Sequence, residues 1–123
     1  MARQRTILAV DDSLTIRELI NFVLGNAGFK VLLAEDGVEG LERLAAGAAP
    51  DVIITDVNMP RLDGLSFIEK ARETHARGTP ILVLTTESAP EQKARAKAAG
   101  ATGWIVKPFN PAQLVEAVNR VAS

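Results

Sequence analysis

The sequence of 123 residues contains no cysteine, so disulfide bonds and thiolate metal sites are excluded. Its formal net charge is −1, which provides no general attraction to nucleic acids or membrane surfaces. No apolar run approaches the roughly 20 residues that cross a bilayer, and the run at Ile7–Val10 is too short for a signal peptide. We therefore expect a cytoplasmic protein with neither a nucleic-acid nor a membrane partner.

Apolar strand-like runs alternate with amphipathic helical segments along the whole chain. The expected strands are Ile7–Val10, Val31–Leu33, Val52–Thr55, Ile81–Leu84 and Trp104–Val106. Three of the intervening helices begin with capping signals, at Asp36, Ser88 and Asn110. Strands that are apolar almost throughout are typical of a parallel sheet covered on both faces. The pattern predicts one α/β domain over residues 1–123, with five parallel strands and helices on both faces.

Chemically reactive side chains stand where the predicted strands end. Asp11 and Asp12 follow the first strand, Asp56 follows the third, and Thr85 and Lys107 come at the ends of the fourth and fifth. Right-handed crossovers place the carboxyl ends of parallel strands at the same edge of the sheet. Carboxylates this close repel one another unless a cation lies between them, and oxygen ligands favour Mg²⁺. The sequence therefore predicts a magnesium site at this edge.

The same set of residues suits phosphoryl transfer. A carboxylate can act as a nucleophile toward phosphorus, and a hydroxyl and an ammonium group can neutralise the phosphoryl oxygens. The adjacent Asp11 and Asp12 suit cation binding, which leaves Asp56 as the attacking group, with the backbone carbonyl of Asn58 as a further metal ligand. Taken singly, each residue also has an ordinary interpretation, as an acidic helix start, a strand end or a solvated lysine.

Four motifs together resemble the response-regulator receiver domains of bacterial two-component signalling. They are Val10–Ser13, Thr55–Pro60 with Asp63 and Gly64, Leu84–Glu87, and Lys107–Phe109, in the order and spacing of that family. The sequence is most similar to the stand-alone chemotaxis-type regulators. The resemblance implies a flavodoxin-like fold with the strand order 2-1-3-4-5.

The resemblance also implies the role of each site residue. Asp56 would accept a phosphoryl group from a histidine kinase and become a 4-aspartylphosphate. Mg²⁺ would be held by Asp11, Asp12, Asp56 and the carbonyl of Asn58, with Asp11 acting through a water molecule. Thr85 and Lys107 would contact the phosphoryl oxygens, and the Lys107–Pro108 peptide would be cis. Such a protein is not an enzyme in the usual sense, because it catalyses only its own phosphorylation and dephosphorylation.

Output is expected through binding of another protein. Trp104 takes the place of the family's switching aromatic residue. In the family, that ring moves inward as the hydroxyl at the position of Thr85 moves toward the phosphoryl group. Trp104 can also be simply a packed aromatic side chain. The implied output surface comprises the helix at Glu91–Ala99, the strand at Trp104–Val106 and the last helix. Because the chain ends at Ser123, directly after that helix, we expect no DNA-binding or enzymatic output module. The resemblance to stand-alone chemotaxis regulators implies a monomer that binds a target such as a flagellar motor switch or a sensor kinase complex in chemotaxis or motility control.

Two positions of the motifs vary in the family and adjust the lifetime of the phosphoryl group. They are Asn58 and Glu87, and the same pair occurs in chemotaxis regulators, which implies rapid self-dephosphorylation.

Three other functions fit the sequence less well. A hydrolase of the haloacid-dehalogenase type needs Asp-x-Asp-x-Thr after its first strand, and Ser13 stands at the second aspartate. Nucleotide or flavin binding needs a glycine-rich phosphate loop, whereas Asp11 and Asp12 repel phosphate in the absence of a metal. A binding module that is never phosphorylated would have no need of the complete acidic set and Lys107.

Overall fold

Strands and helices alternate strictly in the computed structural model, which describes residues 4–86 and 89–122. The elements are β1 (Thr6–Val10), α1 (Leu14–Asn26), β2 (Lys30–Ala34), α2 (Gly37–Ala45), β3 (Val52–Thr55), α3 (Gly64–Glu73), β4 (Ile81–Thr85), α4 (Pro90–Ala99), β5 (Gly103–Val106) and α5 (Pro111–Val121). All strand pairs are parallel and their order is β2-β1-β3-β4-β5. The predicted fold class and strand order are confirmed.

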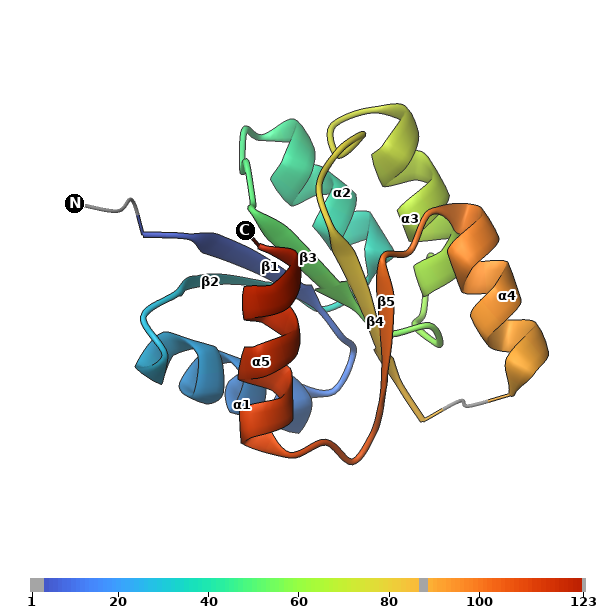
Figure 1. Ribbon diagram of the computed structural model, residues 1–123. Helices are drawn as coiled ribbons and strands as arrows, with labels where there is room; N and C mark the ends of the chain where they lie inside the picture. Colours follow the sequence, from blue (N-terminus) through green and yellow to red (C-terminus); the bar gives the residue numbers. More distant parts are fainter. Residues whose placement is uncertain (1–3, 87–88, 123) are drawn as a thin grey trace.

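The sheet is covered on both faces, which divides the apolar core into two layers (Figure 1). One layer joins the sheet to α1 and α5 and includes Ile20, Leu24, Leu114 and Val118. The other joins it to α2, α3 and α4 and includes Leu44, Phe67, Ile68 and Ala96. Burying each large apolar side chain contributes about 1.5 to 3 kcal/mol, so these two layers hold the helices against the sheet.

Helix starts agree with the capping signals at two of the three predicted positions. The Asp36 side chain accepts a hydrogen bond from Glu39 N (2.9 Å) at the start of α2. Asn110 and Gln113 form a capping box at the start of α5. Ser88, the third predicted cap, lies outside the described residues, and α4 has Ala89 as its N-cap.

The helix α4 is attached to the domain mainly at its C-terminal end. Within α4, all of whose residues are described, Ala96 is the only buried side chain. The Arg72 guanidinium on α3 donates to the carbonyl oxygen of Gly100, the C-cap of α4, at 2.7 and 3.1 Å. The same guanidinium donates to Thr79 O (2.6 Å) and to Ala76 O. These contacts join the ends of α3 and α4 to the loop before β4.

None of the helices among the described residues is both long enough and apolar enough to cross a membrane.

Candidate functional site

The pairing of β1 with β3 places two of the predicted acidic residues side by side. Val10 is paired in register with Thr55, so Asp11 and Asp56 are the next residues on the two neighbouring strands. Asp56 N donates to Val10 O (3.0 Å) and Asp11 N donates to Ala34 O (3.1 Å), which extends the backbone ladder past the strand ends. The backbone of both aspartates is therefore held by the sheet.

Three carboxylates gather at this edge. Asp11, Asp12 and Asp56 each offer one oxygen, and these oxygens all lie within 4.8 Å of one another. Asp11 is only 1% exposed and Asp56 is 9% exposed, whereas Asp12 is open to solvent. An acidic cluster with both a buried wall and an open side is suited to a cation that enters from solvent.

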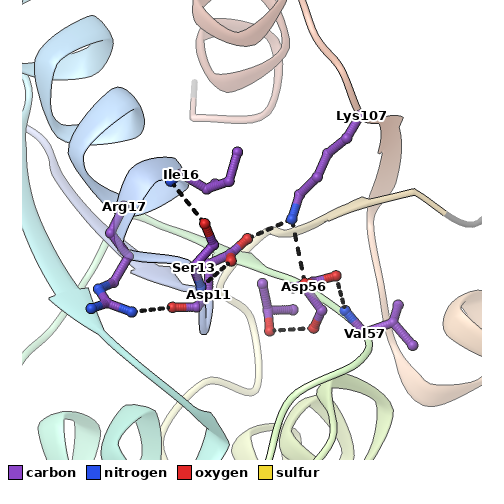
Figure 2. Close-up of polar contacts among 8 residues, drawn as sticks. Asp11, Ser13, Ile16, Arg17, Asp56, Val57 and Lys107 are labelled. Carbon is purple, nitrogen blue, oxygen red and sulfur yellow. Dashed lines mark hydrogen bonds and ion pairs between the residues drawn. The ribbon is translucent and has the colours of Figure 1, made fainter.

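Lys107 reaches this cluster from the end of β5 (Figure 2). Its Nζ donates to Asp11 Oδ2 at 2.8 Å and to Asp56 Oδ2 at 3.3 Å. Its backbone N–H donates to Thr85 O (2.8 Å), and the Lys107–Pro108 peptide is cis, as the resemblance implies. The ammonium group thus bridges two of the carboxylates.

Burial shapes the charge balance of this cluster. It raises the pKa of the Asp11 carboxyl, and the hydrogen bonds from Lys107 and Ser13 offset the rise only in part. Burial alone would lower the pKa of Lys107, but the hydrogen bonds and charges of Asp11 and Asp56 raise it above its ordinary value. Lys107 therefore keeps its positive charge, and the three carboxylates of the cluster outnumber this single cation. Oxygen donors with an excess of negative charge fit a hard divalent cation such as Mg²⁺.

Backbone N–H groups fix the orientation of both buried carboxylates. Asp11 Oδ1 accepts from Ser13 N (2.9 Å), and Asp56 Oδ1 accepts from Val57 N (2.7 Å). Arg17 Nη1 donates to the carbonyl oxygen of Asp11 (2.8 Å) from the first turns of α1. In each carboxylate, the second oxygen faces the Lys107 ammonium group.

The remaining predicted residues lie around the cluster. Thr85 is the last residue of β4 and is fully buried. Trp104 pairs with Val83, two residues before Thr85, so Trp104 and Thr85 belong to the same face of the sheet. Trp104 is half-buried and packs against the α2–α4 layer, and Asn58 is exposed in the loop after β3. Glu87 lies outside the described residues.

The structure also reveals an ion pair between the β3–α3 loop and the start of α2 that the sequence did not indicate. Arg61, in the loop between β3 and α3, donates to Asp36 Oδ2 from Nε (2.7 Å) and to Asp36 Oδ1 from Nη2 (3.0 Å). The hydrogen bond from Arg61 is the main cause that lowers the pKa of the Asp36 carboxyl. The partners are 25 residues apart in the sequence, and no motif or helical spacing links them.

The lowered pKa of Asp36 leads to a prediction about stability and pH. An aspartate whose pKa is depressed by folding stabilises the protein above its unfolded-state pKa, and this contribution is lost as the pH falls through the folded-state value. We expect wild type to be more stable than Asp36→Asn at pH 7, and the difference to shrink from about pH 5 downward. Urea unfolding of both proteins at a series of pH values measures this; a difference that stays constant with pH would contradict it.

The chain is similar in sequence and in structure to known proteins of one family. Residues 7–119 match the family model of the response regulator receiver domain. The chemotaxis protein CheY1 of Helicobacter pylori is 43% identical over 112 residues, which cover 89% of this chain and 90% of that protein. The solved structure of chemotaxis protein CheY4 of Vibrio cholerae has 48% identity and a TM-score of 0.91, covering 97% of this chain and 99% of that one. The chain belongs to the family of response regulator receiver domains.

Proposed function

We propose that residues 1–123 form one receiver domain that works as a phosphorylation-dependent switch, with Asp56 as the residue that accepts the phosphoryl group. The observation that carries this proposal is the contact of Lys107 with both Asp11 and Asp56 beside a third carboxylate. The phosphodonor is a histidine kinase, and the protein catalyses only its own phosphorylation and dephosphorylation.

In the proposed reaction, an oxygen of the Asp56 carboxylate attacks the phosphorus of a phosphohistidine. The phosphorus–nitrogen bond breaks, its electron pair leaves with the imidazole, and an acyl phosphate forms on Asp56. Val57 N–H holds one carboxylate oxygen in place (2.7 Å), and the Lys107 ammonium group lies beside the other (3.3 Å). Lys107 and the hydroxyl of Thr85 then stabilise the attached phosphoryl oxygens.

The metal in this proposal is Mg²⁺, which would be held by Asp11, Asp12, Asp56 and the backbone carbonyl of Asn58, with Asp11 acting through a water molecule. When bound, Mg²⁺ supplies positive charge against the phosphoryl oxygens. The convergence of three carboxylate oxygens within 4.8 Å supports this assignment.

The proposed output is binding of a target protein by the surface of α4, β5 and α5, in the cytoplasm and by a monomer. Thr85 and Trp104 would transmit the phosphorylated state to that surface, since they share one face of the sheet. The exposed Lys93, Arg95 and Lys97 on α4 favour an acidic partner. Because several relatives are named as chemotaxis proteins, we infer a role in chemotaxis or motility control, with a flagellar motor switch or a sensor kinase complex as the kind of target.

Acetyl phosphate tests the proposal without a kinase. In the presence of Mg²⁺ we expect the intact mass of the protein to rise by one phosphoryl group, and hydroxylamine to remove that group because it is an acyl phosphate. Chelation of the metal should prevent the modification. The fluorescence of Trp104, the single tryptophan, provides a second readout of the switch. Failure to form any hydroxylamine-sensitive adduct would overturn the proposal.

A further inference from the structure

The loop between β3 and α3, residues 56–63, carries Asn58, and its two ends are held close together at the base. Gly64 N donates to Val57 O at 2.7 Å, and a Cβ atom on Gly64 would lie 1.9 Å from Asp56 O. The two ends of the loop are therefore held close together. These contacts fix the base of the loop, but they leave its tip, at residues 60–62, to be positioned by other contacts.

The tip of this loop has an unusual backbone. Leu62 N donates to Pro60 O (2.7 Å), which closes a three-residue turn around Arg61. The φ angle of Arg61 is +65°, and among the described residues it is the only non-glycine residue with a positive φ. A side-chain-bearing residue in this region is strained, and such strain persists only where surrounding contacts impose it.

The contacts that impose it come from the start of α2. The guanidinium of Arg61 binds both oxygens of Asp36, at 2.7 and 3.0 Å. The Asp36 side chain is 4% exposed and also caps α2, so its position is fixed by the helix. Next to it, a Cβ atom on Gly37 would lie 2.7 Å from Leu62 O, which shows how closely the tip of the loop approaches α2.

We propose that the Arg61–Asp36 pair is a clamp that positions the loop for metal binding, by holding the Asn58 carbonyl toward the carboxylates of Asp11, Asp12 and Asp56. Arg61 stands three residues after Asn58 and is half-exposed, with its charged end turned to α2. It is a positioning residue, because it acts on the metal site through the loop backbone. Residues that orient ligands from outside typically change metal affinity by about 10- to 100-fold when removed. This inference rests on the proposed function, since it concerns the same Mg²⁺ site.

Substitutions of Arg61 separate the clamp from the strained backbone. Arg61→Ala removes the ion pair and keeps the strain, whereas Arg61→Gly removes the ion pair and relaxes the backbone. Asp36→Asn removes the partner charge and leaves an equally good helix cap. The matched control is Arg120→Ala, which breaks an exposed ion pair with Glu116 on α5.

Calorimetric titration with Mg²⁺ alone measures the effect on the unphosphorylated protein. We expect both Arg61 variants and Asp36→Asn to bind Mg²⁺ about tenfold more weakly than wild type, and Arg120→Ala to bind it normally. The double variant Asp36→Asn/Arg61→Ala should lose no more affinity than either single one, because both changes remove the same pair. In labelling by acetyl phosphate, the variants should be slow at low Mg²⁺ and reach the wild-type rate at saturating Mg²⁺.

The outcomes distinguish this inference from the function on which it rests. If wild type binds Mg²⁺ and is labelled, but Arg61→Gly binds the ion as tightly as wild type, the clamp is refuted and the proposed function stands. If the variants are less stable but their Mg²⁺ affinity is unchanged, Arg61 has a purely structural role and the clamp is again refuted. If wild type itself binds no Mg²⁺, both proposals fail.

Discussion

Asp56→Asn should abolish covalent labelling by acetyl phosphate completely. The substitution keeps the volume and shape of the side chain but replaces the anionic oxygen by an amide, which is a far weaker nucleophile. Val57 N–H can still donate to the remaining carbonyl oxygen, as it does to Asp56 Oδ1 at 2.7 Å, so the local structure should persist. Intact-mass spectrometry measures the labelled fraction, and circular dichroism verifies the fold.

A matched control for this variant is Asp63→Asn, the same chemical change at an exposed residue. Asp63 caps α3 by accepting a hydrogen bond from Ser66 N (2.8 Å), and asparagine caps helices equally well. We expect normal labelling of this control. If Asp56→Asn were labelled as fully as wild type, a different residue would be the nucleophile and the proposed reaction would have to be abandoned.

Gly64→Ala should be among the most destabilising single methyl additions in this protein. The new Cβ would lie 1.9 Å from Asp56 O, and a backbone carbonyl cannot rotate away as a flexible side chain can. Relief requires the loop to open, which breaks the hydrogen bond from Gly64 N to Val57 O (2.7 Å). We expect the free energy of unfolding to fall by about 3 kcal/mol or more, as measured by urea denaturation.

The corresponding control is Gly25→Ala. Gly25 lies within α1, and a Cβ atom there would meet nothing within 4 Å. Replacing a glycine by alanine inside a helix reduces the conformational freedom of the unfolded chain, so we expect a gain of about 0.5 to 1 kcal/mol. Equal effects of the two substitutions would show that the close approach at Gly64 does not govern stability.

Much of the fold could be predicted because its signals are local. The five strands are short apolar runs, and Asp36 and Asn110 mark helix starts through residues only two or three positions away. Local signals do not give the strand order. Alternation of strands and helices indicates a parallel sheet, but it does not specify which strands are neighbours. The order 2-1-3-4-5 followed from the family resemblance of the motifs, and the structure confirms it.

The meeting of the acidic residues and Lys107 at one edge of the sheet could also be predicted from the sequence. Strand ends gather at one edge of a parallel sheet, so Asp11, Asp56 and Lys107 converge whatever the details of packing. The contacts of Arg61 and Arg72 could not be predicted in this way. Long flexible cations on exposed segments have many potential partners, and the choice of Asp36 or Gly100 depends on tertiary structure. The metal ligands and the roles of Thr85 and Trp104 remain predictions.

Arg72 fixes one end of α4 in place through its two hydrogen bonds to the carbonyl oxygen of Gly100. The C-terminal end of α4 is fastened to α3, whereas its N-terminal end begins at Ala89, whose methyl group cannot cap a helix. A helix of 10 residues is about 15 Å long, so a small rotation about the fastened end displaces the other end most. The N-terminal end is the one that follows β4 and Thr85 in the chain, so a displacement of Thr85 would act on α4 at the point farthest from Gly100.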